Sequence, residues 1–508
     1  MGSSEERLGD GVEPSPQVGA KASHDSANPE NLLKFMVTGW AAPPSSLPEP
    51  ISGAERFAAR RAAVSALFPG ETLAIPTGRE KIRANDTTYR FRPGTDFYYL
   101  TGNVEADGVL VLTPSEDGHL ATLFVEPNPG KSDATFFTDR FKGELWVGPR
   151  LGVPQSRARY GLEARPLADL PGLCEQLVAS AEPWRVLRGV DPDFDTRFSA
   201  QPERDAALAA ALSELRLIKD ELELEELREA IASTKRGFED VIRALPAAAT
   251  ERVVEGVFNL RARVEGNDVG YNTIAASGPN ACILHWTRND RALCEGDLLL
   301  LDAGVEAQSL YTADITRTLP VSGTFTAEQR EIYQLVQDAQ EAALAECRPG
   351  RDFLDPNRAA MRVLAGGLAR LGILRTTAEE ALLDQNQFYK RYSLHNVSHM
   401  LGLDVHDCAA ARQEAYRYGK LHAGVVLTVE PGLYFQIDDL TVPARYRGIG
   451  VRIEDDVAIT ETGCEILSAA IPRATDDVEA WIASLRGRPG PEAWNVPQTG
   501  RRSPVTAD

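Results

Sequence analysis

The sequence predicts two folded parts, an α+β domain preceded by a smaller α/β domain. Its 508 residues are too many for one ordinary hydrophobic core, and its 43% apolar and 25% charged residues are usual values for a globular protein. Short strand-like runs alternate with helical runs over residues 53–215, which is typical of an α/β domain. Longer helical stretches accompany pairs of apolar strand-like runs over residues 216–475, which indicates an α+β domain.

The smaller domain contains two runs that favour strands. Residues 108–113 and 121–125 are mostly apolar and are bounded by turn residues. A charge-dense helical stretch begins near Leu215, and its closely spaced Glu, Arg and Lys residues are typical of an exposed helix. We therefore place the boundary between the domains after residue 215.

Helices open the second domain and recur along it. The sequence predicts them over roughly 220–245, 250–265, 326–347 and 355–373.

Both ends of the chain have the composition of tails. Residues 1–52 are rich in Ser, Pro, Gly, Ala and Glu, and residues 476–508 contain Arg-Gly-Arg-Pro-Gly-Pro. Such stretches bury little apolar surface, so we predict a disordered tail at each end and no chemistry in either.

The charge balance limits the partners. Asp and Glu number 74 against 54 Lys and Arg, a formal charge of -20, which disfavours nucleic acid and anionic membrane surfaces. An acidic balance is compatible with cation binding, although solubility alone accounts for it. The six cysteines have no close pairs, the amino terminus lacks the pattern of a signal peptide, and the apolar run at 298–301 is too short to span a bilayer. We therefore expect a cytoplasmic protein.

Two aspartates are the first candidate metal ligands. Asp302 ends the apolar run Leu-Leu-Leu-Leu, and Asp314 follows twelve residues later. A fully extended chain would separate them by about 40 Å, but a turn within residues 306–310 would fold the two strands into a hairpin. The two carboxylates would then lie side by side, where like charges are unfavourable unless a cation lies between them. The alternative is a surface loop with two solvated aspartates, which the apolar run disfavours.

A histidine cluster follows in the second domain. His395, His399 and His406 are three of the seven histidines and lie within twelve residues, among Leu, Met and Val. A single histidine is more often a core residue than a ligand. Three together favour a metal ligand with neighbours that bind or carry protons.

Two more carboxylates occur in apolar strand-like runs. Glu430 ends Val-Val-Leu-Thr-Val and precedes Pro431, which favours an extended backbone. A buried carboxylate there is costly unless it is paired or bound to metal. Alternation places Arg452 and Glu454 on one face of a strand, although an exposed strand with an ion pair would have the same pattern.

The five candidate ligands together indicate two metal ions. Four carboxylates and one imidazole carry too much negative charge for one divalent cation, and mostly oxygen ligands favour manganese, cobalt, iron or zinc over copper. Two such metals bridged by hydroxide are a known arrangement for hydrolysis. The predicted ligands are Asp302, Asp314, His399, Glu430 and Glu454.

Five motifs in this order resemble those of the Xaa-Pro aminopeptidases over roughly residues 53–475. They are Asp302-Ala-Gly, Asp314-Ile-Thr-Arg-Thr, His395-Asn-Val-Ser-His-Met-Leu-Gly-Leu-Asp-Val-His, Leu427-Thr-Val-Glu-Pro-Gly-Leu-Tyr and Gly448-Ile-Gly-Val-Arg-Ile-Glu-Asp-Asp. The resemblance implies a pita-bread catalytic domain behind a smaller amino-terminal domain. It also implies two divalent metals, often manganese, with cobalt, zinc or iron as alternatives, and removal of the first residue of peptides that have proline second.

The resemblance also implies roles for individual residues. Asp314 and Glu454 match the ligands that bridge the metals, and Glu430 matches a further carboxylate ligand. For the mechanism, we expect Glu430 to handle the proton of a bridging hydroxide. The resemblance implies substrate-side or catalytic positions for five further residues, which are His285, His395, His406, Arg452 and Tyr434.

The resemblance also bears on Trp146 and on the interval between the two aspartates. Trp146, in Gly143-Glu-Leu-Trp-Val-Gly-Pro-Arg, matches a tryptophan that reaches a neighbouring subunit's site, although packing within its own domain is equally compatible. The interval between Asp302 and Asp314 is one residue longer than usual, and a β-bulge or a longer turn would absorb it. Relatives of this kind form homodimers or homotetramers.

Three other readings share the fold. Prolidases cut only Xaa-Pro dipeptides, but Ser398 and the continuous amino-terminal domain favour the aminopeptidase. Methionine aminopeptidases lack a long domain of the type expected at 53–215. Metal-free binding proteins on this fold have lost ligands that are all present here.

Overall fold

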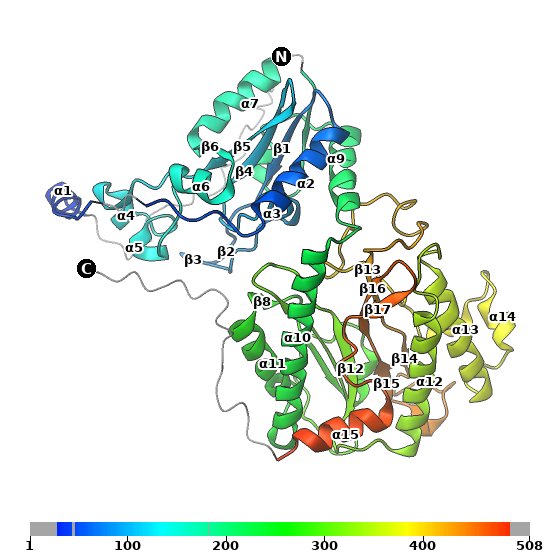
Figure 1. Ribbon diagram of the computed structural model, residues 1–508. Helices are drawn as coiled ribbons and strands as arrows, with labels where there is room; N and C mark the ends of the chain where they lie inside the picture. The colour runs from blue at the N-terminus through cyan, green and yellow to red at the C-terminus, as the bar shows by residue number, and fades with distance from the viewer. Residues whose placement is uncertain (1–27, 43–45, 181, 488–508) are drawn as a thin grey trace, which may run out of the picture. The chain divides into compact units, whose positions relative to one another are not determined.

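The computed structural model describes residues 28–42, 46–180 and 182–487 (Figure 1). The chain divides into two compact units, Met1–Ala209 and Ala210–Asp508. The division falls within helix α9, Pro202–Leu215, whereas the sequence placed the boundary after that helix. No helix of the described ranges is long and apolar enough to cross a membrane.

A five-stranded mixed sheet organises the first unit, with strand order β6-β5-β4-β1-β7. The two predicted strands are confirmed as β4, Val109–Ser115, and β5, Gly118–Val125, which pair antiparallel. Buried side chains of the sheet and of α7 form its core. The other strands are β1 Thr72–Pro76, β2 Ile82–Ala84, β3 Thr87–Thr88, β6 Glu163–Pro166 and β7 Trp184–Val186.

Helices flank this sheet and one precedes it. The short helix α1 lies within the stretch 1–52 for which the sequence indicated a disordered tail, and it buries no side chain. Most of that predicted tail lies outside the described residues. The helices of the unit are α1 Glu30–Met36, α2 Ala54–Leu67, α3 Thr95–Thr101, α4 Thr135–Thr138, α5 Glu144–Val147, α6 Val153–Tyr160, α7 Leu170–Ala179 and α8 Pro192–Asp195.

The second unit has helices on both sides of antiparallel strands (Figure 1). Helices α10 and α11 pack against β10 and β12, and α12 and α13 pack against the carboxyl-terminal strands. All four helices that the sequence predicted are confirmed. They are α10 Glu221–Ala244, α11 Glu251–Glu265, α12 Ala327–Leu344 and α13 Asp355–Arg370, and the short α14 is Ala378–Leu382.

Two three-stranded sheets and two pairs of strands lie in the described part of this unit. Their orders are β12-β10-β9, β13-β16-β17, β14-β15 and β11-β8. The strands are β8 Asp268–Val269, β9 Ile274–Ser277, β10 Leu298–Ala303, β11 Val305–Glu306, β12 Ile315–Pro320, β13 Val426–Val429, β14 Gly432–Tyr434, β15 Gly450–Arg452, β16 Asp455–Ile459 and β17 Cys464–Ile466.

The folded unit extends beyond residue 475, where the sequence indicated the start of a tail. Helix α15, Thr475–Leu485, buries Val478, Trp481 and Ile482 in the core formed with α10 and β10. Its apolar residues recur at helical spacing, and burying them stabilises the helix. Residues 488–508 of the predicted tail lie outside the described residues.

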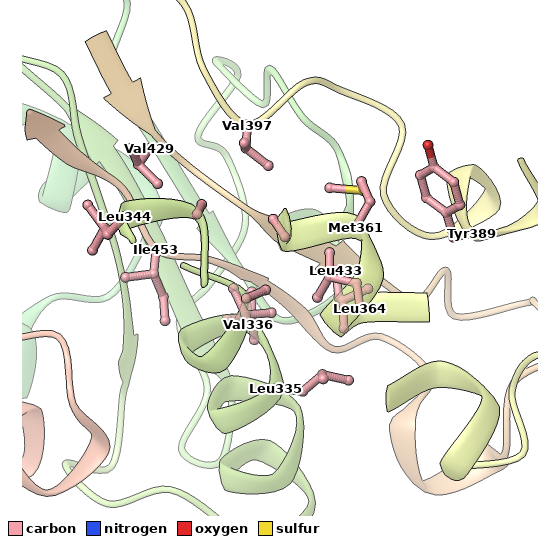
Figure 2. Close-up of a cluster of buried hydrophobic side chains, with 14 of the residues drawn as sticks. Leu335, Val336, Leu344, Met361, Leu364, Tyr389, Val397, Val429, Leu433 and Ile453 are labelled. Carbon is pink, nitrogen blue, oxygen red and sulfur yellow. The ribbon is translucent and has the colours of Figure 1, made fainter. Parts of the chain in front are cut away.

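The larger core lies between α12, α13 and the strands that precede the predicted ligands. Figure 2 shows part of this cluster, including Val336 of α12, Val429 at the end of β13 and Ile453 between β15 and β16. Val429 and Ile453 are fully buried and directly precede Glu430 and Glu454. Packing on one side of each strand therefore fixes where the next side chain points.

Candidate metal centre

The predicted hairpin between Asp302 and Asp314 is present. Strands β10 and β12 pair antiparallel, with Asp302 opposite Thr316 and Ala303 opposite Ile315. The same register continues to Glu306, which bridges Thr312, so no β-bulge interrupts it. Asp314 therefore lies two positions along the ladder from Asp302 on the same face of the hairpin.

The turn at the hairpin's end accommodates the length of the interval. The chain reverses over residues 308–310, with the Ala307 amide donating to the Tyr311 carbonyl at 2.8 Å. Leu310 has φ of 66°, a left-handed conformation that a longer turn needs. At Gly304, opposite Asp314, a Cβ atom would meet the Ala313 carbonyl oxygen at 1.7 Å, so only glycine fits.

Tyr271 joins the two aspartates. Its hydroxyl lies 2.6 Å from Oδ1 of Asp302 and 2.5 Å from Oδ1 of Asp314. Burial and the neighbouring carboxylates raise the pKa of Tyr271 well above its ordinary value, so it stays a donor. The second oxygen of Asp302 accepts from Nη2 of Arg452 at 2.5 Å.

His399 lies beside β13, which carries Glu430 at its end. The Thr428 amide donates to the His399 carbonyl at 3.0 Å, and the Glu430 amide donates to the Val397 carbonyl at 2.8 Å. This pairing places Nε2 of His399 3.7 Å from Oε1 of Glu430 and 3.2 Å from Oδ2 of Asp314.

Glu454 lies between β15 and β16 and is hydrogen-bonded to β12. Its amide donates to the Thr316 carbonyl at 3.1 Å, and its carboxylate accepts from the Thr316 hydroxyl at 2.6 Å. Arg452 and Glu454 do share a face, but both are buried, which excludes the alternative of an exposed strand.

The chemistry of these donors fits divalent metal. One ligand atom each of Asp314, His399 and Glu454 lies within 4.8 Å of the other two. Asp302 and Glu430 adjoin this group, and Arg452 is the cationic side chain that contacts a member of the cage. Four clustered carboxylates therefore exceed the nearby positive charge, and two divalent cations would restore the balance.

The pKa values of these groups reflect the same excess of negative charge. Burial and neighbouring carboxylates raise the pKa of Glu454 well above its ordinary value. Burial raises the pKa of Glu430 to about 7. Burial alone would lower the pKa of His399, but its hydrogen bond to Asp314 and the charges of Asp314 and Glu430 outweigh it and raise the pKa to about 9.

A second group of residues lies beside the cage. Nε2 of His395 and the Tyr434 hydroxyl lie 2.7 Å apart, and Nη1 of Arg452 donates to that hydroxyl at 3.1 Å. Burial and the charge of Arg452 lower the pKa of His395 to about 4, so its imidazole is neutral at pH 7. The chain thus holds a neutral imidazole and a guanidinium next to the carboxylates.

All of the predicted residues of the second unit except Tyr434 line one cavity of about 640 Å³, and Tyr434 contacts two of them. His285 lies on the wall with Leu284, and the His406 ring packs edge-on against His399 with centroids 4.4 Å apart. Apolar side chains, among them Ile274, cover part of the wall.

Trp146 belongs to the first unit, so it is not among these residues. Its indole N–H donates to the Phe137 carbonyl at 2.8 Å, Arg140 lies over its ring, and half of the side chain is exposed. This environment accounts for the ring's position within its own unit, and the exposed half leaves a surface for another molecule.

The sequence did not single out three residues that hold the ligands. Tyr271 directly precedes Asn272-Thr-Ile, a segment that also resembles the family's substrate side, and Thr316 lies within Asp314-Ile-Thr. Asp456 accepts from the Asp314 amide at 3.1 Å. Only their adjacency to known motifs could have indicated them, because their partners lie far away along the chain.

Comparison with known proteins identifies the family. Residues 225–461 match Metallopeptidase family M24, and residues 57–187 match the aminopeptidase P amino-terminal domain. Xaa-Pro aminopeptidase 1 of Streptomyces coelicolor is 51% identical over 462 residues, 90% of this chain and 93% of that protein. Xaa-Pro aminopeptidase of Escherichia coli is 37% identical over 456 residues, 84% of this chain and 97% of that protein.

Solved structures agree with this assignment. Aminopeptidase P from E. coli with the inhibitor Pro-Leu has a TM-score of 0.77 and 34% identity, covering 86% of this chain and 99% of that one. The zinc-substituted enzyme with product has the same score and identity, covering 87% and 100%. The chain is therefore a family M24 metallopeptidase with the pita-bread fold. Within that class it belongs to the Xaa-Pro aminopeptidases, as its motifs predicted, and it is a metal-dependent exopeptidase.

Proposed function

We propose that this cavity removes the first residue of peptides whose second residue is proline, with two divalent cations held by the five predicted ligands. The observation that carries the proposal is the convergence of Asp314, His399 and Glu454 within 4.8 Å, next to two further carboxylates. The oxygen-rich set supports manganese as the metal, with cobalt, zinc and iron as alternatives. Cations bound here would polarise the scissile carbonyl and lower the pKa of a water molecule.

Glu430 has the properties of the residue that moves the proton. In the metal-free chain, burial raises the pKa of Glu430 to about 7, so this carboxylate holds a proton more firmly than an exposed glutamate does. It also lies between the two groups of the site, 3.7 Å from His399 and 3.5 Å from Nδ1 of His395. We assign to it the transfer of a proton from the attacking water to the leaving nitrogen.

His395, Arg452 and Tyr434 form the half of the site that stabilises negative charge. Arg452 is buried and remains charged, and Tyr434 links it to the neutral His395. Donors held in place in a buried site stabilise an oxyanion at little reorganisation cost. We assign this task to His395 and Arg452, with Tyr434 orienting both.

His285 and His406 are proposed to contact the substrate from the cavity wall. Both rings line the cavity, and His406 packs against the ligand His399. The exposed part of Trp146 supports the proposal that it reaches a neighbouring subunit, in a homodimer or homotetramer. The net charge of -20 supports peptides rather than nucleic acid or membrane as partners. The free cysteines of the described residues support a cytoplasmic location.

The decisive experiment compares three substrates in the presence of manganese. A tripeptide Xaa-Pro-Yaa should be cleaved, Xaa-Ala-Yaa should be cleaved far more slowly, and the dipeptide Xaa-Pro should resist. Cleavage of the dipeptide alone would indicate a prolidase specificity. Metal analysis of the same sample should find two divalent ions per chain, and EDTA should abolish turnover.

A further inference from the structure

Glu251, the first residue of α11, is a fully buried carboxylate with an unusual set of partners. Oε1 accepts from the Ser277 amide at 2.7 Å, from the Ser277 hydroxyl at 2.9 Å and from Nδ2 of Asn280 at 3.0 Å. Oε2 accepts from the Trp286 indole at 2.8 Å and from the Arg291 amide at 2.9 Å. Five donors and no direct cation therefore satisfy this charge.

These donors belong to the two ends and the middle of one loop. Ser277 ends β9, Arg291 lies where the loop closes, and the Glu251 amide in turn donates to the Arg291 carbonyl at 3.0 Å. Trp286 also packs with Leu284 against a small apolar cluster. Glu251 thus ties the ends and the middle of the loop at residues 278–290 together, alongside the bonds that Asn289 makes with β9 and its flank and that Gln436 makes with the Cys282 carbonyl.

His285 lies in that loop, directly before Trp286. Its ring lines the cavity, and within the described residues no hydrogen bond holds it. Its position in the cavity therefore follows from the backbone on either side, chiefly from the clamped Trp286. A loop without its own strand partners needs such anchors to present a side chain reproducibly.

We infer that Glu251 is a positioning residue for the peptidase reaction, which acts by holding His285 against the substrate through Trp286 and Arg291. The inference rests on the substrate-contacting role proposed for His285. Glu251 lies outside the metal cage and touches neither substrate nor metal in this assignment. Its contribution is the order of the loop before substrate arrives.

A double-mutant cycle with Glu251→Gln and His285→Ala tests the inference. In glutamine an amide nitrogen replaces one oxygen, so either orientation forfeits at least two accepted hydrogen bonds. We expect Glu251→Gln alone to lower kcat/KM for Xaa-Pro-Yaa by about tenfold to a hundredfold, as misplacement of an active-site group does. In the His285→Ala background the same change should alter kcat/KM by less than about twofold.

Kinetic parameters distinguish positioning from general damage. Glu251→Gln should change the same parameter, kcat or KM, that His285→Ala changes, with metal content unaltered. Trp286→Phe removes one donor without disturbing Glu251 and should reproduce a smaller part of the effect, so the test survives if Glu251→Gln does not fold. Asp290→Asn, which removes a surface ion pair with Arg288 on the same loop, is the matched control and should leave activity unchanged.

The possible outcomes distinguish the positioning role of Glu251, the role of His285 and the proposed substrate. Additive losses from Glu251→Gln and His285→Ala would overturn the positioning role while leaving the role of His285 intact. Full activity of His285→Ala would overturn both. Failure of the wild-type protein to cleave Xaa-Pro-Yaa would instead contradict the proposed substrate, independently of either variant.

Discussion

His395 and His399 are four residues apart, line the same cavity and titrate in opposite directions. Carboxylates surround His399 and raise its pKa to about 9, whereas burial and Arg452 lower the pKa of His395 to about 4. The cavity thus has an acidic half around His399, which is suited to cations. It also has a donor half around His395 and Arg452, which is suited to a developing oxyanion. Two histidines of one motif therefore titrate differently because of the neighbours that other strands supply.

Removing the acidic half should have the largest effect. His399→Ala or Asp314→Ala deletes a ligand from the three closest donors, so we expect loss of turnover and of bound metal. Activity with added manganese and metal content by elemental analysis check this, with circular dichroism as the test of folding. Substantial turnover by either variant would contradict the cage.

Removing the guanidinium should cost stability as well as activity. Arg452→Met leaves Asp302 buried without its ion-pair partner, which typically costs about 3–5 kcal/mol. Denaturant unfolding of the metal-free protein measures it. Arg358→Met, which removes an exposed pair on α13, is the control and should change stability by less than about 1 kcal/mol. Equal losses in the two variants would show that Arg452 does not neutralise the site.

Chelation should reveal the pH dependence of the acidic half. The folded-state pKa of His399, about 9, exceeds its ordinary 6.5, so its stabilisation is complete below pH 6.5 and is lost as pH rises through 9. The pKa of Glu430, raised from 4.5 to about 7, also makes the folded protein lose stability as pH rises, in this case between 4.5 and 7. The Tm of the EDTA-treated enzyme should therefore fall between pH 6.5 and 9.

The contribution of His395, in the donor half, changes with pH in the opposite direction. The pKa of His395 is lowered from 6.5 to about 4, so its stabilisation is present above pH 6.5 and is lost as pH falls toward 4. Tm curves of His395→Phe and His399→Phe, both metal-free, separate the two contributions. A Tm of the chelated wild type that rises between pH 6.5 and 9 would contradict the assignment for His399.

The smallest effect is expected from removing the Tyr434 hydroxyl, which links His395 to Arg452 in the donor half. Tyr434→Phe removes the hydroxyl between His395 and Arg452 but leaves both charged and imidazole groups in place. Loss of these two hydrogen bonds, each worth about 1 kcal/mol, should lower kcat/KM by roughly tenfold to thirtyfold. Metal content should not change, and a loss of metal would place Tyr434 in the cage rather than beside it.

The elements of the fold were more predictable than the contacts within the site. Helices α10 to α13 carry apolar residues at helical spacing, and Asp302 and Glu430 follow long apolar strands, so local sequence indicates both. Helix α15 was assigned to a tail because the composition of its polar surroundings hid a short apolar face. A boundary read from composition is therefore less secure than one read from periodicity.

The contacts of Tyr271 and Glu251 could not be predicted in the same way. Tyr271 reaches aspartates 31 and 43 residues away, and Glu251 binds donors between 26 and 40 residues along the chain. No periodic pattern connects such positions, because their proximity follows from the packing of α11 and the loops onto β9 and β10. Apolar runs, the histidine cluster and the family resemblance indicated the candidate ligands but not these supports.

The unbroken register between β10 and β12 bears on how this enzyme can change over evolution. A residue inserted within either strand would turn Asp302 or Asp314 to the opposite face of the sheet. A residue inserted at 308–310 leaves both side chains where they are, since the loop lies beyond the last bridge at Glu306 and Thr312. Insertions and deletions among relatives should therefore collect at this hairpin tip, the one place where the interval between the two ligands can drift without selection against it.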